Sequence, residues 1–212
     1  MSPILANIYL HHVLVKWFEE TVKAHCTGRA TLCVYADDFV CALEKESDAR
    51  RFYQTLPKRI GRYGLEVAPE KTNLIQFSRY GGKANGTFEF LGFEFRWSKS
   101  KQKGKPYVKR TTARAKFRKS IQGLTHWCKK FRNLKARVLI FKLNAKLRDY
   151  YNYYGVFGNR ESIWLFSYHA HRTLYKWLNR RNQRKSYSWE GFSALLKIYP
   201  LVSPNCCGEV RR

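Results

Sequence analysis

The chain has 212 residues, 44% hydrophobic and 16% aromatic, which is enough apolar material for a folded core and excludes a disordered chain. It carries 41 Lys and Arg against 15 Asp and Glu, a net charge of +26, which indicates a polyanionic partner, most commonly nucleic acid. No apolar run is long enough to span a bilayer, and the six cysteines form no C-x-x-C pair, so we expect no membrane contact and reduced thiols.

The charge is unevenly distributed along the chain. Residues 1–97 carry 13 basic and 11 acidic side chains, whereas residues 98–212 carry 28 and 4, a net charge of +24. A ribosome-associated or histone-like basic protein is one interpretation, but such proteins rarely contain this many Trp, Tyr and Phe. We therefore expect the C-terminal half to bind nucleic acid.

The first predicted elements are a helix and a tight hairpin. Ser2 is a candidate N-cap with Pro3 at the first helical position, and apolar residues recur at helical spacing from there to Trp17. Residues 31–36 (TLCVYA) and 39–43 (FVCAL) are two β-rich apolar runs. Because only Asp37 and Asp38 separate them, we expect a hairpin with both acids at its turn.

A second helix and further strands follow the hairpin. Residues 47–63 have helical periodicity, with Ser47 as the expected N-cap and Gly64 as the stop. Short strands are expected at 73–77 (NLIQF) and within 88–96 (FEFLGFEFR). This order of elements predicts an α+β sheet covered by helices.

Residues 98–110 (SKSKQKGKPYVKR) are dense in Lys and resemble a linker, so we place the domain boundary between residues 97 and 98. The pattern beyond it is helical. The expected helices are 111–131, 134–152, 160–182 and 188–197.

The most informative motif is Tyr35-Ala36-Asp37-Asp38. Adjacent carboxylates on a tight turn repel each other unless a divalent cation lies between them, and nucleotidyl transfer uses two Mg²⁺ ions at such a site. A solvent-exposed acidic turn is the ordinary alternative for a bare Asp-Asp pair. The aromatic and β-branched residues on either side favour the catalytic interpretation.

The motif resembles the YADD box of group II intron reverse transcriptases, and three further segments match that family in order. Residues 2–10 (SPILANIYL) resemble the preceding helix, residues 64–72 (GLEVAPEKT) the following motif with its lysine, and residues 90–95 (FLGFEF) the primer-grip hairpin. The resemblance implies a partial right-hand polymerase palm over residues 1–97 and a mostly helical thumb/maturase (X) domain over 98–212.

The resemblance also implies roles for individual residues. Asp37 and Asp38 would be catalytic ligands of Mg²⁺, and Lys71 would lie near the triphosphate. The remaining positions would place the primer and the nucleotide: Tyr35, Ala36, Leu91 and Gly92. Without the resemblance, Lys71 would be interpreted as a surface lysine and the Leu91-Gly92 pair as a plain hairpin bend.

The sequence departs from the family pattern in a way that affects the expected polymerase activity. A polymerase palm uses a further aspartate from an earlier strand and fingers that hold the nucleotide, and both would lie before Met1. Three other acids are expected on the far side of the hairpin or on the next helix, where they would not obviously substitute: Glu44, Glu46 and Asp48. We therefore expect no polymerase activity from this chain alone.

The basic helical region resembles the thumb/maturase region, whose helices grip a primer–template duplex and intron RNA. Its candidate RNA-binding residues are Arg110, Arg114, Arg118, Lys119, Lys142, Lys146 and Arg148. Interleaved cations and aromatic rings suit structured RNA, which is held by phosphate contacts and base stacking. Alternatively the cations form a solvated face, and we expect five aromatic residues to be core rather than stacking platforms: Trp164, Phe166, Trp177, Trp189 and Phe192.

Three hypotheses follow. In an intact protein the chain would support RNA-directed DNA polymerisation and intron splicing, with group II intron RNA, an RNA template with a DNA primer, and deoxynucleoside triphosphates as partners. Alternatively it is a non-enzymatic splicing factor that binds intron RNA, or a decayed gene fragment. For the first two we expect an intracellular ribonucleoprotein in the cytoplasm, with an organelle as the alternative location.

Overall fold

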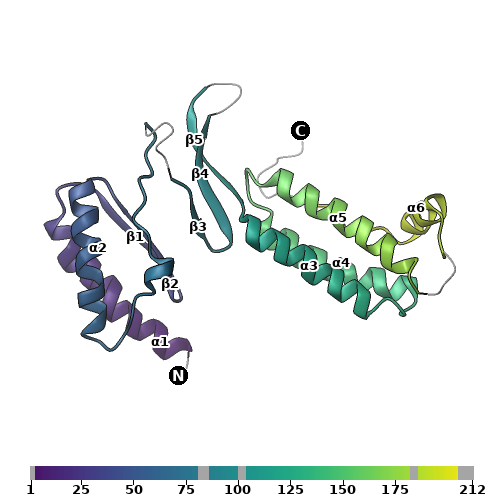
Figure 1. The fold of residues 1–212 in the computed structure, drawn as a ribbon, viewed down its shortest axis with the longest axis horizontal. Coiled ribbons are helices and arrows are strands. Elements are labelled where there is room, and N and C mark those ends of the chain that lie inside the picture. Colours follow the sequence, from purple (N-terminus) through teal and green to yellow (C-terminus); the bar gives the residue numbers. More distant parts are fainter. Residues whose placement is uncertain (1–2, 81–85, 100–103, 182–185, 205–212) are drawn as a thin grey trace. The chain divides into compact units, whose positions relative to one another are not determined.

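A computed structural model describes residues 3–80, 86–99, 104–181 and 186–204. The chain forms two compact units, Met1–Leu91 and Gly92–Arg212 (Figure 1). The first combines helices with a β-hairpin, and the second begins with a β-hairpin and continues as helices. The predicted α+β class is confirmed.

The first unit opens with a nearly continuous helical segment. It comprises α1 (Pro3–Leu10), the π-helical segments η1 (His11–Lys16) and η2 (Phe18–Val22), and the 3-10 turn η3 (Lys23–His25). Leu14 and Phe18 are fully buried, whereas Ile4 at the start is 71% exposed. The expected helix is thereby confirmed, although its proposed cap, Ser2, lies outside the described residues.

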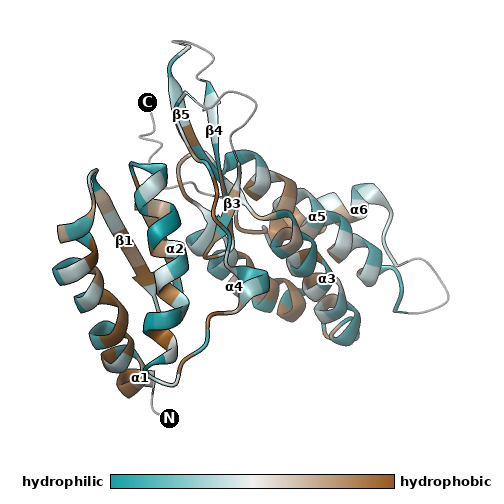
Figure 2. Cartoon of the chain, turned by 60° about the vertical axis from the view of Figure 1, so that its left-hand side comes forward, coloured by the Kyte–Doolittle hydropathy of each residue, from teal (hydrophilic) through white to brown (hydrophobic). Residues whose placement is uncertain are grey.

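The hairpin consists of β1 (Ala30–Tyr35) and β2 (Asp38–Leu43), paired antiparallel from Ala30 with Leu43 to Tyr35 with Asp38. Alternate side chains, among them Leu32, Val34 and Phe39, pack against the buried residues of the helices. Figure 2 shows the apolar residues of β1 and of the first helical segment in brown. The predicted hairpin is confirmed.

The helix α2 (Glu46–Gly61) covers the same side of the hairpin with Phe52, Leu56 and Ile60. Its N-cap is Lys45 and not Ser47, because the helix begins one residue before Ser47. At the other end Gly64 has a φ of +67°, and the Leu65 N–H donates to the Ile60 carbonyl at 3.3 Å. This left-handed ending confirms Gly64 as the stop.

The expected strand at 73–77 is wrong. After the 3-10 turn η4 (Pro69–Lys71), the described residues form no strand before β3 (Phe88–Phe90). Leu74 and Ile75 are 45% and 36% exposed, so they gain little burial from an extended conformation. A β-rich sequence forms a strand only where another strand is available to pair with it.

The second unit begins with a hairpin of β4 (Phe93–Lys99) and β5 (Pro106–Thr112), paired from Phe93 with Thr112 to Lys99 with Pro106. The expected strands within 88–96 are confirmed by β3 and β4. The linker interpretation of 98–110 is wrong for residues 98–99 and 106–110, which belong to this ladder. The lysines at positions 99 and 109 therefore lie on a β-hairpin and not in a flexible connection.

Four helices follow: α3 (Arg114–Lys130), α4 (Ala136–Tyr154), α5 (Arg160–Leu178) and α6 (Trp189–Ile198). All four predicted helices are confirmed, although α5 ends four residues earlier than expected. Leu139, Leu143 and Leu147 recur every four residues along α4 and are fully buried in one core with the apolar residues of α5.

The hairpin of the second unit is tied to its helices by one buried amide. Asn159, between α4 and α5, is completely buried. Its Oδ1 accepts a hydrogen bond from the Thr112 N–H at 2.9 Å, and its Nδ2 donates to Thr112 Oγ1 at 2.8 Å and to the Tyr154 carbonyl at 2.9 Å. These bonds fix the end of β5 against the helical layer.

The cysteines that the structure describes form no disulfide with one another. Cys26, Cys33, Cys41 and Cys128 are free thiols, as expected, whereas Cys206 and Cys207 lie outside the described residues. Within the described part of the chain, no helix combines the length and apolarity needed to cross a bilayer.

Candidate active site and nucleic-acid interface

The Asp-Asp motif forms the tight end of the β1–β2 hairpin. Ala36 and Asp37 occupy the two central turn positions, and Asp38 begins β2 opposite Tyr35. Ala36 has a φ of +49°, a conformation that residues other than glycine rarely adopt. Only the first central residue has a positive φ, as in a type II′ turn. The turn thus presents two consecutive carboxylates at the end of a hairpin anchored by a buried core.

The four motif residues are accessible. All are exposed, and the Tyr35 side chain is 64% exposed. Neither Asp37 nor Asp38 forms an ion pair with a described Lys, Arg or His. Unlike the other carboxylates of the hairpin region, these two are not neutralised by neighbouring cations in the described part of the chain.

The chemistry of Asp37 and Asp38 fits Mg²⁺. This ion prefers oxygen ligands and is commonly held by one or two carboxylates together with the phosphates of a substrate. No group of three or more His, Cys, Asp or Glu that could hold a metal occurs among the described residues. The pair therefore has the right ligand atoms for an ion that is completed by substrate phosphates.

Three other acids lie at the opposite end of the hairpin. Glu44 accepts hydrogen bonds from the Arg29 backbone N–H and guanidinium, which hold its pKa below the usual value. Glu46 pairs with Arg50 on the first turn of α2. The β1–β2 register places this end six residue pairs from the Asp37-Asp38 turn. The expected location of these acids, away from the Asp37-Asp38 turn, is confirmed.

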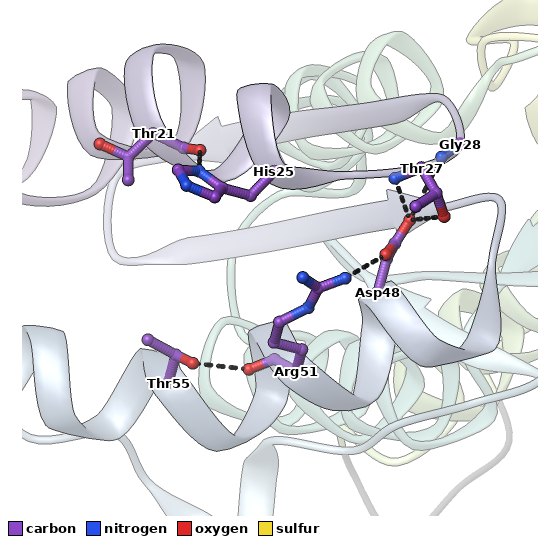
Figure 3. A network of polar contacts seen from close by, with 7 residues as sticks. All are labelled: Thr21, His25, Thr27, Gly28, Asp48, Arg51 and Thr55. Carbon is purple, nitrogen blue, oxygen red and sulfur yellow. Dashed lines mark hydrogen bonds and ion pairs between the residues drawn. The ribbon is translucent and has the colours of Figure 1, made fainter.

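Asp48 is the third of these acids and has a structural role that its sequence position did not reveal. It is 3% exposed and accepts hydrogen bonds from the N–H groups of Thr27 and Gly28, while Arg51 donates at 2.7 Å (Figure 3). Burial raises the pKa of Asp48, but these donors outweigh it and hold the pKa below its ordinary value. The charged carboxylate thus joins α2 to the chain entering β1.

The remaining predicted catalytic residue, Lys71, ends the short turn η4 and is exposed. The Tyr53 hydroxyl donates to the neighbouring Thr72 carbonyl at 3.3 Å and so ties this segment to α2. No described hydrogen bond or ion pair joins Lys71 to the Asp37-Asp38 turn. Its ammonium group is available to an external anion.

The expected primer-positioning pair forms a second tight turn. Leu91 and Gly92 have φ values of +51° and +75°, the combination found in a type I′ turn. The Gly92 carbonyl accepts a hydrogen bond from the Ala113 N–H at 2.9 Å. A Cβ at Gly92 would lie 3.0 Å from the Tyr154 hydroxyl oxygen, so both the conformation and the close approach favour glycine.

The seven predicted RNA-binding side chains are all exposed, but they do not form one row. Arg114 and Arg118 lie one turn apart on α3 and line a shallow pocket with Ser162 of α5. Lys119 follows them on α3, and Arg110 lies on β5. On α4, Arg148 follows Lys146 by two residues, about 200° around a helix, and therefore belongs to another face.

Lys142 and Lys146 form the best-defined part of this surface. They lie one turn apart on α4, opposite Trp127 of α3 and Phe131, the residue that caps the C-terminal end of α3. The Lys142 ammonium lies 5.9 Å from the centre of the Phe131 ring, and that of Lys146 lies 5.4 Å from Trp127. The structure thus brings together a basic ridge and an aromatic ridge, the combination that suits RNA.

The expectation for the other aromatic residues is only partly confirmed. Phe166, Trp177 and Phe192 belong to the core. Trp164 and Trp189 are 50% and 56% exposed, so their assignment to the core is wrong. The hydrophobic core of the helices is supplied mainly by Leu and Ile, which leaves these two rings at the surface.

Comparison with known proteins gave a family match over the N-terminal part of the chain. Residues 1–95 match the family model described as reverse transcriptase (RNA-dependent DNA polymerase). A search of curated proteins gave no match. Proteins of this family use a nucleic-acid template and primer with deoxynucleoside triphosphates, and generally use Mg²⁺. The matched segment contains the exposed Asp37-Asp38 turn, and residues 1–95 are accordingly a domain of the reverse transcriptase family.

Proposed function

We propose that this chain is the palm and thumb/maturase part of a group II intron reverse transcriptase, which copies RNA into DNA and assists splicing of its intron RNA. The observation that carries the proposal is the exposed Asp37-Asp38 turn within the segment matched to the reverse transcriptase family. In this proposal residues 1–97 are palm and residues 98–212 are the thumb/maturase domain. The protein acts as an intracellular ribonucleoprotein.

At the catalytic turn, Asp37 and Asp38 would hold Mg²⁺. The chemistry that the bound ion would supply is activation of the 3′ oxygen of the primer and stabilisation of the leaving pyrophosphate. The carboxylates are oriented by the rigid hairpin, and the small side chain of Ala36 leaves room for the reacting groups. The exposed Tyr35 ring offers a surface to the primer terminus and the incoming nucleotide.

Two further contacts place the substrates. The exposed ammonium of Lys71 meets the triphosphate and offsets charge on the departing pyrophosphate. The type I′ turn of Leu91 and Gly92 positions the primer strand, with the Gly92 backbone held by its hydrogen bond to Ala113. The exposed cations of the second unit hold the template–primer duplex and the intron RNA through phosphate contacts.

Primer extension tests this proposal. We expect a longer form that carries these residues together with the further palm aspartate and the fingers to extend a DNA primer on an RNA template with Mg²⁺. In that longer form Asp37→Asn should abolish extension while RNA affinity changes little. Glu46→Gln is the matched control, because it removes one negative charge at the other end of the hairpin. Loss of RNA binding with Asp37→Asn would mean that the carboxylate is structural.

A non-enzymatic splicing factor that binds intron RNA is the second candidate. It is favoured by the paired basic and aromatic ridges of α3 and α4, which need no catalytic turn. Binding of a structured RNA should weaken steeply with salt, with a slope of roughly −0.7 to −0.9 per phosphate contact. Replacing Lys142 and Lys146 with Gln should reduce that slope by about 1–2, whereas Lys197→Gln on α6 should change it less. Affinity that is independent of salt would exclude this candidate.

A further inference from the structure

A surface pocket opens between α3 and α4, beside the ridge of Lys142 and Lys146. Its volume is about 360 Å³, at the lower end of the range for small-ligand sites, about 300–1,000 Å³. The lining residues that bear on its chemistry are Ser120, Gly123, Trp127, Lys146, Asp149 and Tyr150. This size suits a single planar group better than an extended ligand.

Asp149 gives the pocket an unusual charge. It is one of only 4 acidic residues among residues 98–212, which contain 28 Lys and Arg. Its side chain is exposed and forms no ion pair within the described part of the chain. A free carboxylate repels phosphate and accepts hydrogen bonds from N–H groups. The pocket is therefore suited to the donor edge of a ligand and not to its phosphates.

Gly123 indicates that the pocket is kept open. Glycine lowers helix stability, and Gly123 lies in the middle of α3. A Cβ at this position would meet no atom within 4 Å, so packing does not require glycine there. Its φ is not in the left-handed region, so the backbone does not require glycine either. Gly123 lines the pocket, and a side chain at this position would occupy the open space.

The walls offer flat aromatic surfaces and one exposed cation. The Tyr150 ring stacks on Phe166 with 3.6 Å between ring centres and 14° between planes, so it is rigidly held. Trp127 is half-buried and packs against Phe131. Lys146 is exposed, lines the pocket, and has its ammonium 5.4 Å from the centre of the Trp127 ring. Aromatic walls of this kind suit a nucleobase, because every base has a π face.

We propose that this pocket binds an unpaired guanine base of the RNA held by the second unit. The inference rests on the proposed function, since it presupposes RNA binding. The N1–H and N2–H donors of guanine lie side by side and match the two oxygens of the Asp149 carboxylate. Adenine and cytosine present a donor next to an acceptor, and uracil has one donor between two carbonyls. Lys146 donates to the O6 oxygen of guanine, while Lys142 contacts the adjoining backbone.

Binding of hairpin RNAs that differ at one bulged nucleotide tests this inference. The 212-residue chain is titrated into RNAs carrying guanine, inosine, adenine or an abasic site at the bulge, at one salt concentration. We expect guanine to bind about 5- to 100-fold more tightly than the abasic site, as for other bidentate base contacts. Inosine lacks the N2 amine and should fall between the two. Equal affinity for all four RNAs would overturn the inference.

Two variants locate the effect in the pocket. Asp149→Asn replaces one acceptor with a donor, so the guanine preference should be lost and adenine should gain relative to guanine. Gly123→Gln fills the open space with a good helix former, so the guanine preference should disappear while the helical circular dichroism is retained. Glu190→Gln removes an exposed acid from α6 and is the matched charge control, which should keep the preference.

The outcomes separate this inference from the proposed function. If all four RNAs bind equally well and the binding weakens with salt, guanine recognition is wrong and RNA binding stands. If none of the RNAs binds, both are wrong. A guanine preference that persists in both Asp149→Asn and Gly123→Gln would show that the base is recognised elsewhere, which also overturns the inference.

Discussion

Replacing Asn159 with Ala should destabilise the second unit strongly. The Asn159 side chain is completely buried, and its three hydrogen bonds of 2.8–2.9 Å join the Thr112 backbone, the Thr112 hydroxyl and the Tyr154 carbonyl. An unsatisfied buried polar group costs about 1–3 kcal/mol. The Thr112 N–H would lose its acceptor, and the Thr112 hydroxyl oxygen and the Tyr154 carbonyl would each lose a donor, so we expect a total loss of about 3–5 kcal/mol.

Urea unfolding followed by tryptophan fluorescence measures this loss, since five of the six tryptophans belong to the second unit. Asn152→Ala is the matched control, because Asn152 is exposed on α4 and should change the stability by less than about 0.5 kcal/mol. Asn159→Asp keeps the acceptor for the Thr112 N–H but loses both donors, so it should remain destabilising. If Asn159→Ala unfolds at the same urea concentration as Asn152→Ala, the amide does not anchor β5.

Three further changes test other contacts. Gly92→Ala should cost about 1–2 kcal/mol through its left-handed φ, plus a steric term against the Tyr154 hydroxyl that Tyr154→Phe relieves in a double-mutant cycle of urea unfolding. Asp48→Asn should destabilise the first unit at neutral pH. The charged Asp48 carboxylate contributes to the free energy of unfolding above its unfolded pKa of about 3.9, and this contribution is lost as the pH falls through the lower folded pKa. Acid unfolding of the wild type and of Asp48→Asn measures the difference. Gly123→Ala should stabilise α3 by up to about 1 kcal/mol in urea unfolding.

Each of these expectations has an opposing outcome. Additive effects of Gly92→Ala and Tyr154→Phe would mean that the two groups do not meet. Parallel acid-unfolding curves for the wild type and Asp48→Asn would mean that Asp48 is not held in its charged form. Destabilisation by Gly123→Ala would mean that a side chain at this position clashes with a neighbouring residue. The presence of glycine at position 123 would then be explained by packing and not by the pocket.

Local sequence patterns predicted most of the elements. Alternating apolar residues on either side of Asp37 and Asp38 predicted the β1–β2 hairpin, and helical periodicity predicted α3 to α6 to within a few residues. These features depend on neighbours in sequence, because side-chain direction repeats every two residues in a strand and every 3.6 in a helix. The exposed Asp-Asp turn followed from the same local pattern.

The failures share one cause, which is that pairing partners are distant in sequence. Residues 73–77 have strand-forming side chains but form no strand, although the Gly86 N–H donates to the Gln76 carbonyl at 2.9 Å. Residues 98–110 look like a linker, yet residues 98–99 and 106–110 lie in the β4–β5 ladder. A segment rich in exposed lysines has the same composition in a hairpin as in a linker, so composition does not distinguish the two.

The sequence by itself determined the charge asymmetry, the helices and the turn that bears Asp37 and Asp38. Only the tertiary structure decided which side chains meet across elements. It buried Asp48 against the Thr27–Gly28 backbone, divided the cations of the second unit between separate faces, and opened a pocket beside Asp149. The physical reason is that burial and hydrogen bonding depend on distances in space, which the packing of separate elements sets and local sequence periodicity does not.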